Sequence, residues 1–346
     1  MLENIPKGDF HNFNRFVSQR KLNGAIVFNK PRPVFWEMFF FGERSPLKRV
    51  FTSTTIQMNL RHLQAKGVFD NDVKAINSAD RLATLDDFYA FGQLLAYCYF
   101  FGLQDIHKDN LLITENGLQV IDLEQAFSDM LLPNQSLLLP VNPGGIWIAG
   151  LNVLTNKAID QLGKFESKKM IDGFLSLSKV VLDSVDQITE ILLTSQASFQ
   201  NQPLRVYLRG TKDYDEKLRG ESAVSNWFYE ESVQLTRGDI PYFFSYLGDN
   251  NVYYYTTKCG AIERAEVPAT FHKFTDYCGK NIADLFNKKL IREKWARGIL
   301  FLAKKLEILD GVDLQWTDCS VVRKEGQLKF ISPLLMVTTK AIQKGN

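Results

Sequence analysis

The sequence predicts an α+β fold of two lobes, a small β-rich lobe followed by a larger and mostly helical one. The chain has 346 residues, which is too long for one compact core. Strand-like hairpin patterns are concentrated near the N-terminus, while long apolar or amphipathic helical patterns follow. We therefore expect a division into residues 1–84 and 85–346.

The N-terminal region opens with a predicted β-hairpin. Residues 15–19 and 25–29 are rich in strand-forming side chains, and the Asn23-Gly24 dipeptide between them tolerates positive φ. The second strand delivers Lys30 and ends there, because the proline that follows cannot continue a sheet ladder.

The larger region begins with a near-continuous apolar run that predicts a buried helix over residues 85–103. A polar loop over 104–110 follows, and then a second hairpin over 111–122 that turns at Asn116-Gly117. The later patterns are, in order, a long loop over 128–150, an amphipathic helix over 170–193, an alternating strand with a turn over 201–220 and a strong helix over 282–306.

Composition excludes several classes of function. With 41 basic and 39 acidic residues, the net charge of +2 gives no reason to expect a nucleic acid or a membrane as partner. The four cysteines are scattered, which argues against a zinc site or a disulfide scaffold. The most apolar run, over 91–103, is too short to span a bilayer, and the N-terminus has no signal-peptide pattern. We expect a cytoplasmic protein, with export as an effector left open.

The loop and the second hairpin carry the most informative residues. Asp105, His107 and Asn110 lie in the loop, and Asp122 and Glu124 follow the hairpin. In kinase-like folds, one Asp of such a loop orients or deprotonates the attacking hydroxyl, while the Asn and a later Asp hold Mg²⁺. The hairpin would bring both sets of residues to the same end of a sheet. This order predicts a site for phosphoryl transfer.

Two further features fit such a site. A kinase-like fold needs a lysine on a strand of the small lobe to contact the nucleotide phosphates, and Lys30 is placed to reach phosphate instead of packing. Two of the four histidines, His11 and His107, each follow an aspartate by two residues, Asp9 and Asp105.

Three segments resemble the dehydratase domain of class II lanthipeptide synthetases: residues 8–17, residues 27–32, and residues 105–110 together with 122–124. The resemblance implies a two-lobed fold like that of protein and lipid kinases, ATP and Mg²⁺ as cofactors, and Ser or Thr of a peptide or protein as substrate. It assigns catalysis to Asp9, His11, Asp105 and His107, nucleotide contacts to Lys30 and Arg15, and metal binding to Asn110, Asp122 and Glu124.

The resemblance extends to a second reaction, the elimination of phosphate to leave a dehydroamino acid. The segment with Arg205, Arg209 and Thr211 resembles the element associated with elimination in that family, and residues 235–243 contain its RGDIPYF signature. On alternate positions of one strand, the two arginines would share a face and could clamp phosphate. We interpret Asp239 of the signature as support for its loop.

Three departures from the family are evident. The resemblance begins at the Gly-Asp-x-His motif, so the N-terminal part of the family's dehydratase is missing, and no Cys/His cluster for a zinc cyclase follows. Phe13 and Asn14 stand where the family tends to have glycine. The alternatives are a stand-alone protein or small-molecule kinase without lyase activity, and a pseudokinase scaffold. A separate chain that recognises the substrate is a further possible partner.

Overall fold

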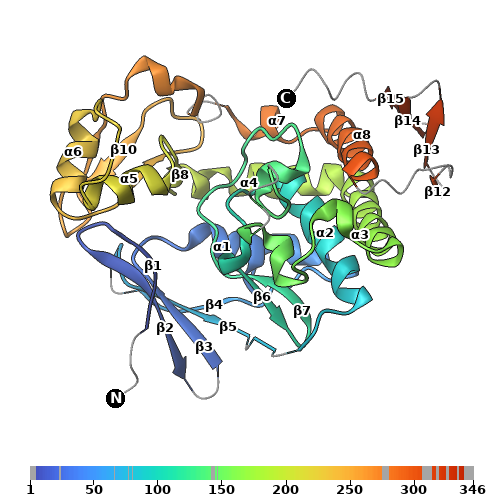
Figure 1. Cartoon of the computed structure of the whole chain (residues 1–346), viewed down its shortest axis with the longest axis horizontal. Helices are drawn as coiled ribbons and strands as arrows, with labels where there is room; N and C mark the ends of the chain where they lie inside the picture. Colours follow the sequence, from blue (N-terminus) through green and yellow to red (C-terminus); the bar gives the residue numbers. More distant parts are fainter. Residues whose placement is uncertain are drawn as a thin grey trace. The chain divides into compact units, whose positions relative to one another are not determined.

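The computed structural model describes residues 5–22, 25–65, 67–76, 78–79, 81–141, 145, 147–274, 280–305, 314–316, 319–324, 327–332 and 335–338. They form a mixed α+β structure with a β-sheet in the N-terminal region and a largely helical C-terminal region (Figure 1). The chain divides into two compact units. Unit 1 comprises Met1–Ser45, Asn59–Asn77 and Ser195–Asn281, and unit 2 comprises Pro46–Met58, Ser78–Thr194 and Ile282–Asn346.

These units differ from the division at residue 84 expected from sequence, because residues 195–281 cluster with the N-terminal sheet. Contacts far apart in sequence explain this. The backbone N–H of Ile240 donates to the carbonyl oxygen of Phe10 at 2.7 Å, and Asp239 accepts hydrogen bonds from the turn that follows β1. Unit 1 is therefore discontinuous in sequence.

The N-terminal part of unit 1 is a five-stranded antiparallel sheet in the order β1-β2-β3-β5-β4. Its strands are β1 (Ile5–His11), β2 (Arg15–Leu22), β3 (Ala25–Lys30), β4 (Arg61–Ala65) and β5 (Asn71–Ala75). The predicted first hairpin is confirmed, since β2 pairs with β3 with Leu22 opposite Ala25. Its turn lies outside the described residues.

Helix α1 (Phe35–Phe41) follows β3 and is mostly aromatic. Phe199 of the later segment packs against it, with ring centroids 6.0 Å from Phe35 and 4.9 Å from Phe39. The indole of Trp36 donates to the carbonyl oxygen of Pro203 at 2.9 Å. Aromatic packing thus joins residues about 160 positions apart within unit 1.

The rest of unit 1 contains a four-stranded sheet in the order β11-β10-β9-β8. The elements of this part of unit 1 are β8 (Leu204–Val206), α5 (Thr211–Leu218), α6 (Tyr229–Thr236), β9 (Phe243–Ser245), β10 (Tyr253–Tyr255), β11 (Ile262–Arg264) and the 3-10 helix η7 (Ala269–Phe274). The strand predicted over 201–220 is therefore wrong beyond residue 206. Gly210 precedes helix α5, whose surface carries ion pairs of i,i+4 spacing such as Lys212–Glu216, and these favour a helix.

The helix predicted at the start of the larger region is confirmed in unit 2 as α2 (Leu85–Phe101). Thr84 and Asp87 form a capping box, in which the Asp87 carboxylate accepts from the Thr84 backbone N–H at 2.8 Å. Nearly every residue after the first turn is buried, as expected of a helix that is apolar on all sides. The helix ends at Gly102 in the left-handed conformation, directly before the candidate catalytic loop.

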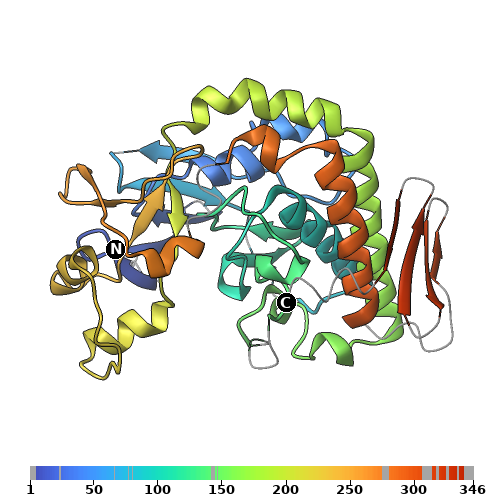
Figure 2. The same ribbon diagram turned by 90° about the horizontal axis from the view of Figure 1, so that it is seen from above.

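The second hairpin is also confirmed, as strands β6 and β7, and two long helices pack nearby in the same unit. Figure 2 shows α3 and α8 running side by side. The amphipathic pattern over 170–193 is divided between two helices. The helix predicted over 282–306 is preceded in the structure by a short turn of helix at its N-terminal end. The bounds in unit 2 are β6 (Leu111–Thr114), β7 (Gly117–Val120), α3 (Lys164–Asp183), α4 (Val185–Phe199, entering unit 1), α7 (Ile282–Leu285) and α8 (Lys288–Lys305).

The remaining elements of unit 2 are short. Its 3-10 helices include η1 (Pro46–Arg49), η2 (Lys108–Asn110), η3 (Pro133–Ser136), η5 (Gly150–Val153) and η6 (Ile159–Gln161), and β12 (Leu314–Trp316), β13 (Cys319–Lys324), β14 (Gln327–Ser332) and β15 (Leu335–Thr338) form a four-stranded sheet. Within the described part of the chain, no helix has the length and apolar character needed to cross a membrane.

Helices α2 and α3 approach closely at Gly92 and Gly173. A Cβ atom on Gly92 would lie 2.0 Å from the backbone oxygen of Met170, and one on Gly173 would lie 2.0 Å from that of Tyr89. Both glycines therefore permit the close contact between α2 and α3.

Gly92→Ala tests this packing because the two relevant effects have opposite signs. In an isolated helix, alanine is favoured over glycine by about 1 kcal/mol. Here the added methyl group overlaps backbone, so we expect unfolding in urea to show a loss of about 2 kcal/mol or more. Gly173→Ala should behave in the same way. A stabilised Gly92→Ala variant would show that the helices are farther apart.

Candidate functional site

The candidate catalytic loop of unit 2 is joined at both ends to the segment that follows β7. At one end the backbone N–H of Gln104 donates to the carbonyl oxygen of Gln125 at 3.3 Å. At the other end the N–H of Ile121 donates to the carbonyl oxygen of Asn110 at 3.0 Å. The predicted catalytic and metal-binding residues lie at or next to these junctions: Asp105, Asn110, Asp122 and Glu124.

Asp105 has a left-handed backbone, with φ of 63°. Aspartate tolerates this region better than most residues, yet a non-glycine residue there still stores strain. The carbonyl oxygen of Asp105 accepts a hydrogen bond from the side-chain amide of Asn110 at 2.8 Å. The two residues that the sequence places five apart are thus held together directly.

The same contact orients the Asn110 amide. A carbonyl oxygen can only accept, so the Asn110 atom that faces Asp105 is the NH₂ group. This nitrogen also lies 3.1 Å from Nε2 of His107, while Nδ1 of His107 faces Asp109, whose backbone nitrogen is 3.3 Å away. His107, predicted to be catalytic, therefore lies beside Asn110. The amide oxygen of Asn110 is the atom suited to bind a cation.

The donor set is compatible with Mg²⁺, which prefers oxygen ligands and is usually held by one or two carboxylates, phosphates and water. Asn110 and Asp122 offer such oxygens, and both residues are half-buried. Among the described residues, no group of three or more His, Cys, Asp or Glu side chains could hold a metal ion by itself. A metal here would therefore depend on phosphate oxygens for its remaining ligands.

In unit 1, Lys30 differs from the expectation that its side chain reaches phosphate instead of packing. It is 1% exposed, and its Nζ atom lies 3.4 Å from Oε1 of Glu37 on α1. Arg32 forms an ion pair with the same carboxylate. Sequence reasoning missed Glu37, although an acidic residue within the aromatic helix that follows the Lys30 strand was a usable signal.

His11 and Arg205 lie side by side in unit 1. Nδ1 of His11 is 2.7 Å from the carbonyl oxygen of Ile240, so this nitrogen carries the proton and donates. In the neutral ring, Nε2 is then the acceptor, and Arg205 lies within 3.3 Å of it. The Arg205 guanidinium also lies over Tyr207 and Tyr242, at 4.3 and 5.0 Å from the ring centroids.

Asp9, the predicted partner of His11, belongs to β1, but its side chain lies outside the described residues.

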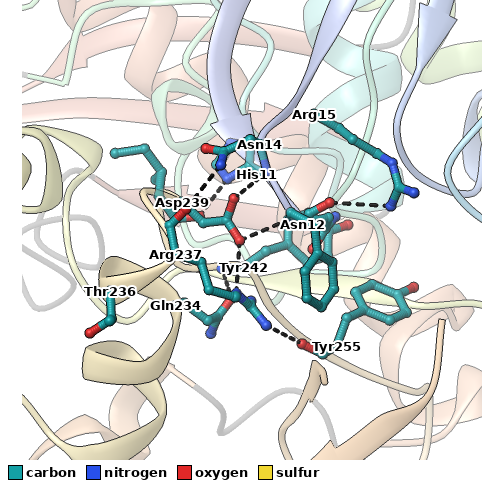
Figure 3. A network of polar contacts seen from close by, with 12 residues as sticks. His11, Asn12, Asn14, Arg15, Gln234, Thr236, Arg237, Asp239, Tyr242 and Tyr255 are labelled. Carbon is teal, nitrogen blue, oxygen red and sulfur yellow. Dashed lines mark hydrogen bonds and ion pairs between the residues drawn. The ribbon is translucent and has the colours of Figure 1, made fainter. Parts of the chain in front are cut away.

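The turn between β1 and β2 contains three consecutive non-glycine residues with positive φ: Asn12 at 50°, Phe13 at 71° and Asn14 at 59°. Such a run is rare, because each left-handed non-glycine residue costs about 1 kcal/mol or more. Figure 3 shows how the turn is held: Asp239 accepts the backbone N–H of Phe13 at 2.9 Å and that of Asn14 at 2.6 Å. The positions where the family that the sequence resembles tends to have glycine thus adopt a conformation that glycine favours.

Arg237 completes this anchor. Its Nε atom donates to the Asp239 carboxylate at 3.1 Å, Nη1 donates to the carbonyl oxygen of Tyr255 at 3.1 Å, and the guanidinium lies 4.1 Å from the centroid of the Phe13 ring. Asp239 is fully buried, so its charge is compensated by these donors. Asp239, predicted to support its own loop, accepts from Arg237 of that loop and also holds the β1–β2 turn.

Arg209 and Arg205 do not share a face of one strand, so the strand geometry predicted for the phosphate clamp is wrong. Strand β8 ends at Val206, and the Arg209 side chain turns to buried Glu231, donating to its two oxygens at 2.7 and 3.2 Å. Tyr214 donates to the same carboxylate at 2.9 Å. Burial, and then the Glu231 charge, raise the pKa of the Tyr214 phenol, so it stays protonated and donates.

Thr211 begins helix α5. The gap lined by Arg205, Arg209 and Thr211 is too narrow to admit a water molecule.

Comparison with known proteins adds one finding. Residues 4–141 match a family model described as a domain of unknown function, DUF4135, a domain associated with lanthipeptide synthetase-like proteins. The match includes the β1–β2 turn, Lys30, the catalytic-loop candidate and the second hairpin, and it ends before Arg205. No curated protein matches the chain.

Arg209→Ala distinguishes a structural role from a phosphate-binding one. Removing the guanidinium leaves the buried Glu231 carboxylate without its ionic partner, which typically costs about 3–5 kcal/mol. We expect this loss in the free energy of unfolding. Arg219→Ala is a matched control, because Arg219 forms an exposed pair with Asp215 and should cost at most about 1 kcal/mol. Equal stability of the two variants would contradict the structural role.

Asp239→Ala tests the anchor of the turn. Two backbone N–H groups and Arg237 lose their acceptor, so we expect unfolding free energy to fall by about 3 kcal/mol or more. Amide hydrogen exchange at Phe13 and Asn14 should accelerate. Adding Asn14→Gly should restore part of the loss by relieving the left-handed strain. Unchanged exchange at both amides would rule out the anchor.

Proposed function

We propose that this protein is an ATP- and Mg²⁺-dependent kinase that phosphorylates Ser or Thr of a peptide or protein, with a kinase-like fold of the type found in class II lanthipeptide synthetases. The observation that carries the proposal is the double junction between the loop of Asp105 and Asn110 and the segment of Asp122 and Glu124. It gathers the residue types that phosphoryl transfer needs within one unit.

The roles follow from the contacts. Asp105 is the candidate to orient the substrate hydroxyl and accept its proton, since its backbone is fixed by Asn110. The amide oxygen of Asn110 and the carboxylate of Asp122 would hold Mg²⁺, and Glu124 is a further oxygen donor beside them. When bound, the metal neutralises charge on the phosphates. The carbonyl oxygen of Asp105 holds the amide nitrogen of Asn110, which leaves the amide oxygen available to a cation.

The buried Lys30–Glu37 pair supports the same proposal. In protein kinases, a strand lysine that contacts nucleotide phosphates is held by a glutamate of a neighbouring helix. Lys30 at the end of β3 and Glu37 on α1 have the same residue types and the same kinds of element, at 3.4 Å. A lysine used in this way is both packed and functional, which accounts for its burial.

Elimination of the phosphate is a separate proposal that rests on Arg205 and His11. The step removes the α-proton and expels phosphate with the C–O bonding electrons. Arg205 could stabilise the departing phosphate, and Nε2 of His11, which faces Arg205 in this structure, could take the proton once Arg205 contacts the phosphate. Arg209 has no part in this step, because it is committed to Glu231. That commitment favours, as a second candidate, a kinase without lyase activity.

The direct experiment combines the purified protein with ATP, Mg²⁺ and Ser/Thr-containing peptides, read by mass spectrometry. A gain of one phosphoryl group reports kinase activity, and a loss of one water reports complete dehydration. Arg205→Ala should convert dehydrated product into phosphorylated product if elimination occurs, because alanine cannot hold the leaving group.

Asp105→Asn and Asp122→Asn should each lower phosphoryl transfer by a factor on the order of 100 or more, since positioning or charge neutralisation is lost. Asp109→Asn is the matched control, because this carboxylate belongs to the same loop but is 75% exposed. We expect near-normal transfer in the control. Normal rates in Asp105→Asn or Asp122→Asn would contradict the proposed site, and the absence of any nucleotide-dependent product would favour a scaffold.

A further inference from the structure

Unit 1 contains a cleft of about 690 Å³ that the proposed phosphoryl transfer does not use. Its volume is typical of a site for a small molecule, or for one side chain of a bound peptide together with the adjacent peptide residues. The lining includes the buried Ser18 and Phe69, the half-buried Arg15, Asn29 and Asp70, and the exposed Lys258.

The cleft is on the face of the β2–β3 hairpin opposite to Lys30. Ser18 pairs with Asn29, so both side chains share one face, and both line the cleft. Lys30 is the next residue after Asn29, and successive side chains of a strand point to opposite faces. Lys30 accordingly takes its partner from α1, and it does not line the cleft. A ligand in the cleft would not be held by Lys30.

Arg15 is already oriented within this cleft. Nη1 donates to the carbonyl oxygen of Asn12 at 3.3 Å, Nη2 donates to that of Lys258 at 3.4 Å, and the guanidinium lies 4.5 Å from the centroid of the Phe69 ring. These contacts use two of the five N–H groups and neutralise none of the charge. In the described part of the chain, Arg15 forms no ion pair with a carboxylate.

Lys258 adds a second cation, and it too forms no ion pair among the described residues. Asp70 is the acidic residue of the lining, and it accepts a hydrogen bond from the Asn29 amide. Two cations against one carboxylate favour an anion. A phosphate monoester carries about 1.5 to 2 negative charges at pH 7 and matches the planar fork of arginine. The remaining carboxylate would accept hydrogen bonds from hydroxyl or amide groups of the same ligand.

We propose that this cleft binds a phosphate monoester whose carrier has hydrogen-bond donors, with Arg15 and Lys258 as its phosphate contacts. This reassigns Arg15, which the family resemblance places at the nucleotide. The proposal is independent of kinase activity, because the cleft and its charges belong to unit 1 alone. The phosphate could be carried by a free sugar phosphate or by a phosphoserine of a peptide, which share this chemistry.

The test is calorimetric titration of the full chain with three probes: inorganic phosphate, glucose 6-phosphate and a short phosphoserine peptide. Arg15→Ala and Lys258→Ala should each raise the dissociation constant about tenfold, while Arg15→Lys should retain part of the affinity. Lys21→Ala is the matched control, since Lys21 is an exposed lysine of β2 outside the cleft. The better of the two esters identifies the carrier.

Competition separates this site from the proposed nucleotide site. Binding that persists in Lys30→Ala and in the presence of saturating ATP and Mg²⁺ supports a distinct site, whether or not the protein proves to be a kinase. Binding lost in Lys30→Ala with unfolding excluded by circular dichroism, or displaced by ATP, overturns it. Equal affinities in wild type, Arg15→Ala and Lys258→Ala, or no binding of any probe at millimolar concentration, overturn it as well.

Discussion

The buried carboxylate of Asp239 is the interaction on which the rest of unit 1 depends. A full charge without solvent is unfavourable unless donors surround it, and here those donors are two backbone amides of the β1–β2 turn and Arg237. Because the turn and the carboxylate are about 225 residues apart in sequence, the interaction closes a very long loop. It also explains why residues 195–281 form one compact unit with the N-terminal sheet.

The anchored turn determines the position of neighbouring functional candidates. His11 precedes it and donates to the carbonyl oxygen of Ile240, the residue after Asp239. Arg15 follows it and donates to the carbonyl oxygen of Asn12 within it. The left-handed strain of the turn is therefore offset by contacts that orient one histidine and one arginine. Strain of this kind is typical of sites where backbone position matters.

In unit 2, the candidate loop is held by hydrogen bonds between segments that are closer in sequence. This loop follows the deeply buried helix α2, and both of its ends are hydrogen-bonded to the segment that follows the short β6–β7 hairpin. Loop closure over so few residues costs little entropy, which favours the approach of Asp105 and Asn110 to Asp122. Backbone hydrogen bonds from Ile106 to Ser136 and from Lys108 to Ile148 hold the loop further. Unit 1 also contains buried ionic contacts such as Lys30–Glu37 and Arg209–Glu231.

Local chemistry in the sequence determined the two hairpins, the buried helix α2 and the spacing that gathers Asp105, Asn110 and Asp122. Turn dipeptides, apolar periodicity and short loops act over a few residues, so they can be read directly from the chain. The match over residues 4–141 agrees with the suspected relationship and leaves the activity open to experiment.

Only the tertiary structure decided which buried charges meet. Glu231 belongs to a helix with no sequence signal for its partner Arg209, and the left-handed turn contains no glycine that would predict it. Arg209 does not share a strand face with Arg205 as expected, and its side chain contacts a carboxylate 22 residues away. Such pairings depend on which distant surfaces are desolvated together, and local pattern does not encode that.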